Sequence, residues 1–404
     1  MKHIYIVDEH QSSKQNGVGT YIRQLLKCFE SSGHDVNLLS FNSDEKEFKI
    51  DAKVNYREYH MPLCGTDNFL KLGALSLPLL RMYIEDQESN VFFVNHSPCS
   101  SFLTYLKKCF PLSRIIFVIH DQGWCAPLLG DSLLMREIVE SKKYLDQKCK
   151  SWKFIKQYCA DERKMYQKAD EVVALANTTA RLLCSDYKVP KEKIHIIPNG
   201  KIKPISPFTA EEKSRIRKRL GFNEKERIIL YAGRVVESKG IFSLLSAFEQ
   251  IYLKEPDVQL VIAGKVIKLE ECVSLTPYAS SHVTYTGLIS EDDVATWCKV
   301  SDICILPSYT EQSSYFGIEM LANGCFIIAT DGNNMDDMFN EDVALIAKTK
   351  RGWDSFKIEL KEKIEFALNM EECSVSNMRS AAFNRYLEKY TIDIMRQSYL
   401  RLIS

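Results

Sequence analysis

The strongest constraint on the fold is the way short, continuous apolar runs alternate with helical stretches along the chain. Residues 115–119 are apolar at every position, whereas a strand with one face in water would alternate apolar and polar side chains. Runs of this kind are typical of strands buried on both faces of a parallel sheet. Such strands are predicted at residues 3–7, 36–40, 91–95, 115–119, 171–176, 194–197, 227–232, 259–263, 283–286, 303–306 and 326–330. The sequence therefore predicts an α/β fold of doubly wound parallel sheets.

The chain of 404 residues is long enough for two such sheets, and a break near its middle separates them. Residues 198–207 contain three prolines and Gly200, which end the strand 194–197 and prevent a helix. A new helical pattern starts at about residue 210, and residues 374–403 are again helical. We expect one domain over residues 1–203, a second over 204–375 and a helical tail over 376–404.

The composition excludes several classes of protein. The chain has 53 Lys and Arg against 53 Asp and Glu, so it lacks the basic excess of a protein that binds nucleic acid through phosphates. No apolar stretch approaches the roughly 20 residues that span a bilayer, and the N-terminus lacks the pattern of a signal peptide. The 13 cysteines are scattered without a CxxC pair, which argues against a disulfide framework or a cysteine zinc site. They favour a reducing, cytoplasmic location.

In the second half, two cations follow a strongly apolar predicted strand. Arg234 and Lys239 lie between the strand 227–232 and a helix predicted from residue 241. Ligands bind at the carboxyl ends of strands in an open α/β sheet, and helix N-termini favour anions. Two cations at this place are suited to hold a diphosphate, although an ordinary exposed lysine at position 239 is the plainer interpretation.

A second loop, after the predicted strand 303–306, carries two carboxylates eight positions apart. Glu311 lies in the loop and Glu319 in the helix that follows, so the two can face one ligand from two sides. Carboxylates accept hydrogen bonds from the vicinal hydroxyls of a ribose or a hexose. Gly317, at the helix start, is expected to leave the amides near Phe316 and Ile318 to phosphate oxygens. The alternative is a pair of surface glutamates without a ligand.

The first half offers fewer candidates. Gly17 and Gly19 stand where a loop passes into a helix, so they either let backbone amides approach an anion or simply begin the helix. His120 ends the strand 115–119 at the mouth of the predicted interdomain cleft, where it can be catalytic, although a lone histidine is more often structural. The lysine-rich residues 142–168 indicate either a solvated helix face or a surface that meets an anionic acceptor or an acidic membrane.

Taken together, these motifs resemble the retaining glycosyltransferases of the GT-B fold, in particular glycosyltransferase family four. The segments that carry the resemblance are residues 162–174, 189–200, 233–240 and 295–308, with Glu311 and Glu319 matching the family's E-x7-E motif. The resemblance covers most of the chain. It implies two Rossmann-like domains facing an interdomain cleft, the first for the acceptor and the second for a nucleotide-sugar donor. It also implies that the C-terminal helices, 376–404, return to the first domain.

The resemblance implies a role for each matching residue. Glu319 is expected to bind the ribose, and Leu288 to lie against the nucleobase. His120 and Glu311 are the implied catalytic residues. The implied donor-sugar ligands are His120, Glu311, Tyr315 and Phe316, and the implied diphosphate ligands are Gly17, Gly19, Arg234, Lys239, Gly317 and Ile318.

The implied reaction is transfer of a hexose-type sugar from a UDP- or GDP-linked donor to an acceptor hydroxyl with retention of configuration. The chain has no D-x-D sequence, and Arg234 and Lys239 can neutralise the leaving diphosphate. We therefore expect no metal and no cofactor besides the nucleotide-sugar. The acceptor stays open between a glycan, a lipid-linked molecule, a peptide and a small molecule, because residues 120–124 and the lysine-rich segment 142–168 differ from generic members of the family. Residues 312–315 also depart from the common pattern, which leaves the choice of donor sugar open.

Four other interpretations stay open. A GT-B sugar-nucleotide epimerase or a phosphorylase would use a similar framework, and a non-catalytic partner subunit could bind a nucleotide-sugar without turning it over. A hydrolase could use Glu311 and Glu319 as an acid/base pair, but the cationic loop would then have no role.

Overall fold

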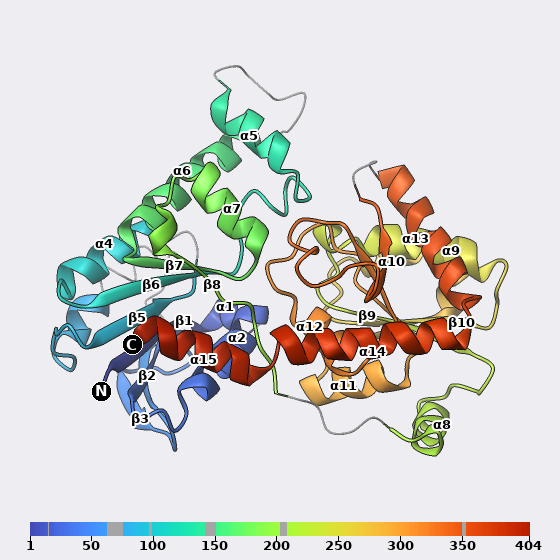
Figure 1. Ribbon diagram of the computed structural model, residues 1–404, viewed down its shortest axis with the longest axis horizontal. Coiled ribbons are helices and arrows are strands. Elements are labelled where there is room, and N and C mark those ends of the chain that lie inside the picture. The colour runs from blue at the N-terminus through green and yellow to red at the C-terminus, as the bar shows by residue number, and fades with distance from the viewer. Residues whose placement is uncertain (15, 63–75, 97–98, 142–150, 203–207, 350–352) are drawn as a thin grey trace. The chain divides into compact units, whose positions relative to one another are not determined.

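The computed structural model describes all residues except 15, 63–75, 97–98, 142–150, 203–207 and 350–352 (Figure 1). The chain divides into two α/β units. Unit 1 consists of Met1–Trp124, Asp131–Gly200 and Ile392–Ser404, and unit 2 consists of Cys125–Gly130 and Lys201–Thr391. Each unit is built on a largely parallel sheet, which confirms the predicted fold class.

Within the described residues, the sheet of unit 1 has eight strands in the order β3-β4-β2-β1-β5-β6-β7-β8, all pairs parallel except β3 with β4. Its strands are β1 His3–Glu9, β2 Asp35–Ser43, β3 Lys49–Ala52, β4 Arg57–Pro62, β5 Asn90–Val94, β6 Arg114–Ile119, β7 Glu171–Ala174 and β8 Ile194–Ile196. Its helices are α1 His10–Ser13, α2 Gly17–Phe29, α4 Ser100–Cys109, α5 Ser132–Glu140, α6 Trp152–Lys168, α7 Asn177–Ser185 and α15 Ile392–Ile403. Because the central strands are parallel, the carboxyl ends of β1 and β6 share one edge.

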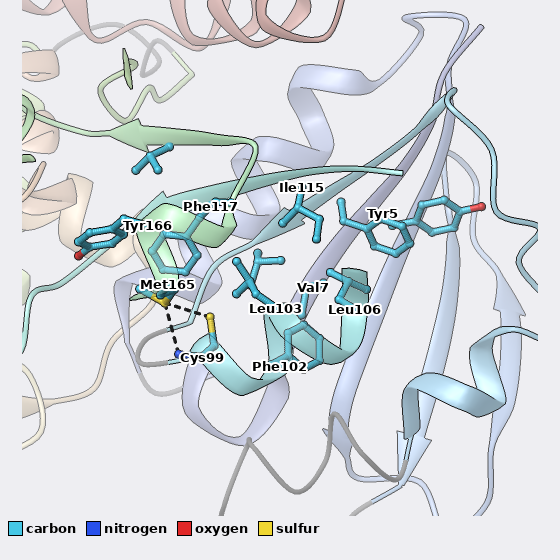
Figure 2. Close-up of a cluster of buried hydrophobic side chains, with 14 of the residues drawn as sticks. Tyr5, Val7, Cys99, Phe102, Leu103, Leu106, Ile115, Phe117, Met165 and Tyr166 are labelled. Atoms are coloured by element: carbon cyan, nitrogen blue, oxygen red, sulfur yellow. Dashed lines mark hydrogen bonds between the residues drawn. The ribbon is translucent and has the colours of Figure 1, made fainter. Parts of the chain in front are cut away.

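On one face of this sheet the core of unit 1 lies against helices α4 and α6, and on the other face buried side chains such as Phe93 pack on α2 and α15. Figure 2 shows Phe102 and Leu103 of α4 packed against side chains of β1 and β6, all of them buried. The Cys99 thiol lies 3.2 Å from the Met165 sulfur at the edge of the same cluster. Burial on both faces explains why residues 115–119 are apolar without alternation.

The described residues of unit 2 form a six-stranded parallel sheet in the order β11-β10-β9-β12-β13-β14. Its strands are β9 Arg227–Ala232, β10 Val258–Ala263, β11 Val283–Gly287, β12 Ile303–Ile305, β13 Ile327–Thr330 and β14 Ala344–Ala347. Its α-helices are α8 Ala210–Arg219, α9 Ile241–Tyr252, α10 Leu269–Ser274, α11 Glu291–Val300, α12 Tyr315–Ala322, α13 Trp353–Leu368 and α14 Glu372–Lys389. Ile229 and Tyr231 face one buried cluster while Ile228 and Leu230 face the other, as the twofold repeat of a strand requires.

The last helix, α15, belongs to unit 1, where Figure 1 shows it in dark red near α2. The hydroxyls of Tyr399 in α15 and Tyr21 in α2 lie 2.7 Å apart, and both residues are buried. The Tyr399 ring also packs on Phe29 and Phe93. The return of the C-terminal helix to the first domain, which the resemblance implies, is confirmed.

The structure draws the boundaries of the units at different places from the sequence. Unit 2 begins at Lys201 rather than 204, and the returning segment begins at Ile392 rather than 376, because α14 packs on unit 2. Tyr390, which lies inside the predicted returning segment 376–404, is instead buried in unit 2, where its hydroxyl donates to the Asp337 carbonyl. Residues 125–130, inside the predicted first domain, also belong to unit 2.

Several elements were not predicted. The strands β3 and β4 are half-exposed and polar, so they lack the apolar run that marks the predicted strands. The strand β14 does lie in an apolar run, residues 343–347, but it was not among the strands predicted above. The short helix α1 occupies what the sequence suggested was a loop. Within the residues that the structure describes, no helix is both long and apolar enough to cross a membrane.

Candidate active site

Two glycines shape the loop that follows β9. The Gly233 amide donates to the Ala263 carbonyl at 2.8 Å, which extends the pairing of β9 with β10 to the first residue of the loop. Gly240 has a φ of 66°, and a Cβ at this position would overlap the Pro307 carbonyl. Only glycine combines this left-handed conformation with so close an approach. The loop 233–240 therefore lies directly against the segment after β12.

Lys239 and Glu311 meet at this contact between the two loops. Lys239 Nζ lies 2.7 Å from Glu311 Oε1 and 3.4 Å from the Thr310 carbonyl oxygen. The Ser308 hydroxyl donates to the same carboxylate oxygen at 2.7 Å. The Lys239 and Glu311 side chains are only 17% and 12% exposed, so their attraction is less screened than that of a surface pair. Two residues predicted separately thus form one ion pair.

The segment after β13 fixes the backbone of Glu311. The Glu311 amide donates to the Asn333 carbonyl at 3.1 Å, and the side-chain amide of Asn334 donates to the Glu311 carbonyl at 2.7 Å. The Thr330 hydroxyl donates to the Ser308 carbonyl at 2.5 Å. The carboxyl ends of β9, β12 and β13 therefore contribute to one site, as expected for neighbouring parallel strands.

Glu319 lies in the middle of α12 and is buried. Its carboxylate forms an ion pair with Lys201, which also lies 3.0 Å from Glu291 Oε2. The Asn323 side chain donates to the Glu319 carbonyl at 2.8 Å. Burial of a carboxylate requires such a counter-charge, and Lys201 supplies it from the segment that joins the two sheets. This partner was not predicted.

The N-terminus of α12 differs from the expectation. Ser314 caps the helix: its hydroxyl accepts a hydrogen bond from the Gly317 amide at 3.2 Å, and its carbonyl accepts one from the Ile318 amide at 2.9 Å. The expectation that Gly317 leaves neighbouring amides available is therefore wrong for Ile318, whose amide is part of the regular helix. Gly317 has another reason to lack a side chain, because a Cβ would overlap the Met338 sulfur.

The remaining candidates of unit 2 differ in exposure. Arg234 is exposed, and its carbonyl accepts a hydrogen bond from the Tyr231 hydroxyl at 2.7 Å. Leu288, beyond the Gly287 turn, is 72% exposed. Tyr315 is half-buried, and Phe316 is buried in the core beneath α12. Arg234 and Leu288 can reach a ligand directly, whereas Phe316 mainly packs the helix onto the sheet.

In unit 1, His120 follows β6 and is held from two sides. Its Nε2 lies 3.2 Å from Asn95 Oδ1, and its ring makes an edge contact with Tyr21 at 4.4 Å between centroids. The Asn95 amide nitrogen already donates to the Val7 carbonyl at 3.0 Å, so Oδ1 is an acceptor and His120 Nε2 must carry the proton. Nδ1 then keeps a lone pair.

Burial, with a smaller contribution from nearby His96, lowers the pKa of His120 to about 3. The imidazole is therefore neutral at physiological pH, and it is too weak a base to hold a proton there. It can orient a hydroxyl by a hydrogen bond, but it is poorly suited to general acid or base catalysis.

The two glycines of unit 1 lie inside the first turn of α2, not in a loop before it. Asn16 caps this helix by accepting a hydrogen bond from the Val18 amide at 2.9 Å. Gly17 is exposed, whereas Gly19 is buried against α1, where a Cβ would crowd the Ser13 carbonyl. Close packing thus explains Gly19 without any ligand, and Gly17 remains the more accessible of the two.

The lysine-rich segment is described only in part, since Lys142, Lys143, Lys148 and Lys150 lie outside the described residues. In α6, Lys153 and Lys164 are exposed. Lys156 donates to the Ser141 carbonyl at 2.6 Å, so it supports the fold. The described part of the segment is thus a mixture of solvated and structural cations.

The structure also brings three thiols together. The sulfur atoms of Cys298, Cys304 and Cys325 lie within 4.8 Å of one another, and within the described ranges no other group of His, Cys, Asp and Glu side chains is placed so that it could hold a metal ion. All three are buried in the hydrophobic core of unit 2. Cysteine is among the most frequently buried residue types, and these thiols pack as small apolar groups.

Sequence reasoning missed the partners that hold the predicted ligands. Ser308 precedes Glu311 by three positions, and a hydroxyl so close to a candidate carboxylate was a usable signal. Lys201, Asn334 and Asn95 reach Glu319, Glu311 and His120 from distant parts of the chain. No local pattern marks such long-range pairs.

Comparisons with known proteins agree with this geometry. Residues 15–200 match the family model described as Glycosyltransferase Family 4, and residues 212–385 match the one described as Glycosyl transferases group 1. An uncharacterized glycosyltransferase of Methanocaldococcus jannaschii is 24% identical, over 98% of this chain and 98% of that protein.

The solved structures show the same fold. Sucrose-phosphate synthase from Thermosynechococcus elongatus has a TM-score of 0.76 at 16% identity, covering 100% of this chain and 98% of the other. An Anabaena protein in complex with UDP and glucose has a TM-score of 0.69 at 13% identity, covering 100% and 99%. The two family models, the E-x7-E pair on α12 and its preceding loop, and the two parallel-sheet units place this chain among the GT-B glycosyltransferases of family 4.

Proposed function

We propose that this glycosyltransferase moves a hexose-type sugar from a UDP- or GDP-linked donor to an acceptor hydroxyl with retention of configuration. The observation that carries the proposal is the ion pair of Lys239 and Glu311 at the carboxyl edge of the sheet of unit 2. It puts a cation for the leaving diphosphate next to a carboxylate for the sugar. The UDP and glucose bound by the Anabaena protein of the same fold support a nucleotide-linked donor.

Lys239 and Arg234 act on the leaving group in this proposal. Cleavage of the bond between sugar and phosphate leaves negative charge on the nucleoside diphosphate, and fixed cations stabilise that charge as it develops. The Gly17 amide and the N-terminus of α12 are the proposed backbone donors, with Gly317 sharing its amide with Ser314. No metal ion or further cofactor has a part in the scheme.

Glu311 and His120 act on the sugars. Ser308 and Lys239 both contact Oε1 of the Glu311 carboxylate, so Oε2 is the oxygen that we assign to a hydroxyl of the donor sugar. His120 is neutral and presents Nδ1 as an acceptor, so we assign it to orienting a hydroxyl. With no base at His120, the acceptor proton passes to the leaving phosphate oxygen.

Glu319 is the proposed ligand of the ribose, held in place by Lys201, and Leu288 is the proposed contact of the nucleobase. We expect Glu319→Ala to weaken binding of free UDP or GDP by about 10- to 100-fold, since charged hydrogen bonds contribute about 1.5–3 kcal/mol. Glu311→Ala should change the affinity for free nucleotide by less than threefold. Isothermal titration calorimetry measures both, with exposed Glu362→Ala in α13 as the matched control. A larger loss for Glu311→Ala would exchange the two roles.

Transfer should not depend on a divalent metal. Because Lys239 and Arg234 supply the positive charge, we expect the rate in 10-fold molar excess of EDTA over total divalent metal to stay within about 20% of the untreated rate. The check is the initial rate before and after chelation, with manganese or magnesium added back. A loss on chelation that either metal restores contradicts the proposal.

A panel of UDP- and GDP-sugars tests the proposed donor class. With one suitable donor and no acceptor, a transferase of this kind hydrolyses the donor slowly, and the nucleoside diphosphate that is released can be counted directly. Release from at least one hexose donor supports the proposal. Formation of an epimeric nucleotide-sugar, or of sugar phosphate without nucleotide, would instead indicate an epimerase or a phosphorylase.

For the acceptor we propose only its class, which is a glycan, a lipid-linked molecule, a peptide or a small molecule. Exposed Lys153 and Lys164, with Phe154 56% exposed between them on α6, support contact with an anionic acceptor or an acidic membrane surface. The described cysteines are free thiols, which supports a reducing, cytoplasmic location. Sedimentation with anionic vesicles compares the chain with a Lys153→Glu, Lys164→Glu variant, which should bind less.

A further inference from the structure

A buried carboxyl in unit 1 contacts the segment that follows His120. Glu162, in the middle of α6, has no exposed surface. Its Oε1 accepts a hydrogen bond from the Gly123 amide at 3.0 Å, and its Oε2 accepts one from the Tyr187 hydroxyl at 2.5 Å. The roles assigned above leave this group unused, although a buried charge-bearing residue is costly to keep.

Helix α6 makes a second contact with Gly123. A Cβ on Gly123 would overlap the Tyr158 ring, so the backbone of Gly123 packs directly on the Tyr158 side chain of α6. Tyr158 and Glu162 are one helical turn apart and therefore share a face. Together they fix the chain three residues after His120, while Asn95 and Tyr21 fix the imidazole itself.

The carboxyl of Glu162 is neutral at physiological pH. Burial, with a smaller contribution from Asp121 in the clamped segment, raises its pKa to about 8, and the hydrogen bonds from Tyr187 and Gly123 only partly oppose this. Titratable groups around this pair include the Cys159 thiol of α6, 3.8 Å from the Tyr187 hydroxyl, and the phenols of Tyr158 and Tyr166, also on α6. In the neutral form Oε1 stays the acceptor for the Gly123 amide, and the proton lies on Oε2, where it is shared with the Tyr187 oxygen. A glutamine has the same shape, with an acceptor oxygen for Gly123 and a donor opposite Tyr187, so Gln can replace Glu162 here.

We infer that Glu162 is a positioning residue for sugar transfer: it anchors the segment 121–123 to α6 and thereby sets the place of His120 at the end of β6. The inference rests on the proposed role of His120 in orienting a sugar hydroxyl. A displacement of about 1 Å in a group that orients substrate can lower the rate by about 100-fold. Most of the donor ligands proposed above lie in unit 2, and Glu162 positions only His120 among them, so we expect turnover to fall far more than the affinity for the donor.

The test compares four variants of the full-length chain. Glu162→Ala removes the anchor, Glu162→Asp withdraws the carboxyl by one methylene, and Glu162→Gln keeps an acceptor for Gly123. Asp161→Asn changes the neighbouring, partly exposed carboxylate of α6 and is the matched control. Each variant is measured for kcat, for the KM of the donor and for the imidazole signals of His120 in ¹⁵N-histidine-labelled protein, assigned with a His120→Gln variant.

We expect Glu162→Ala and Glu162→Asp to lower kcat by roughly 10- to 100-fold and to move the His120 signals, with the donor KM within twofold of wild type. Glu162→Gln should keep kcat within threefold, and Asp161→Asn should match wild type in every readout. Glu162→Asp keeps the test decisive if Glu162→Ala does not fold. A folded Glu162→Asp with unchanged kcat, or a fall in kcat with unmoved His120 signals, overturns the inference. If wild type turns over no donor, the proposed function fails, and the His120 signals alone still decide whether Glu162 positions this residue.

The dependence of stability on pH gives an independent readout. Below pH 4.5 the carboxyl is protonated in both the folded and the unfolded chain, and between about pH 4.5 and 8 only the unfolded chain loses the proton. The wild type is therefore progressively destabilised over this window, relative to a residue that does not titrate. The melting temperature of Glu162→Gln minus that of wild type should rise from pH 5 to pH 8. A difference that is flat or falls over this window contradicts a neutral, buried Glu162.

Discussion

Replacing Lys239 by alanine should lower kcat for sugar transfer by about 100- to 1,000-fold. Removing one preorganised donor from a developing negative charge costs this much in enzymes that stabilise an oxyanion, and the leaving diphosphate carries more charge than an oxyanion. The substitution also removes the partner of Glu311, whose side chain is only 12% exposed. The measurement is the initial rate of product formation at saturating donor.

Lys254→Ala is the matched control. Lys239 precedes helix α9 and Lys254 follows it, but Lys254 pairs with Glu365 at the surface. It should leave kcat within twofold of wild type. Lys239→Arg keeps the charge but not its geometry, so it should recover part of the rate. A Lys239→Ala variant that is folded and loses less than threefold in kcat would contradict the role assigned to this residue.

Replacing Tyr399 by alanine should destabilise unit 1 by about 3–5 kcal/mol, the usual cost of emptying a large aromatic site in a core. The side chain is buried, packs on Phe29 and Phe93, and shares a hydroxyl contact with Tyr21. Tyr399→Phe keeps the ring, so it should cost only about 1–2 kcal/mol for the lost hydrogen bond. Native-state hydrogen exchange of the β1 and β5 amides measures the loss in unit 1.

The β9 and β10 amides serve as internal references for unit 2, where the same variants should have a smaller effect. Leu387→Ala, at a 41% exposed position of α14, is the control for truncation in a C-terminal helix. If Tyr399→Ala left the protection of β1 and β5 unchanged, α15 would not contribute to the stability of unit 1.

The parts of the fold that could be predicted are those in which burial forces a pattern. The strands β6 and β9 are covered on both faces, so successive side chains on both sides of each strand must be apolar. The edge strand β3 faces water, and its neighbour β4 buries only Tyr59 and Met61, so neither has the apolar run that would distinguish it from a loop. Whether α14 and α15 belong to unit 1 or to unit 2 depends on which unit the apolar face of each helix packs against. Both helices have apolar positions, so the sequence does not tell them apart.

For the site, the sequence located the ligand candidates but not their surroundings. Lys239 and Glu311 were recognisable because loops after buried strands end at one edge of a sheet. Lys239 and Glu311 form an ion pair across 72 positions of the sequence, and Lys201 and Glu319 form one across 118 positions. The neutral state of His120 depends on burial, which a sequence does not specify.

The anomeric configuration of the first product tests the central claim most directly. With an α-linked UDP- or GDP-hexose that the chain turns over, ¹H NMR during the first minutes identifies the anomer formed, before mutarotation when water is the acceptor. We predict that the nucleoside diphosphate and the α-configured product appear together, in EDTA, and that Lys239→Ala abolishes both signals. A β-configured first product would contradict retention, and release of no nucleoside diphosphate from any donor of the panel would contradict the proposed transfer itself.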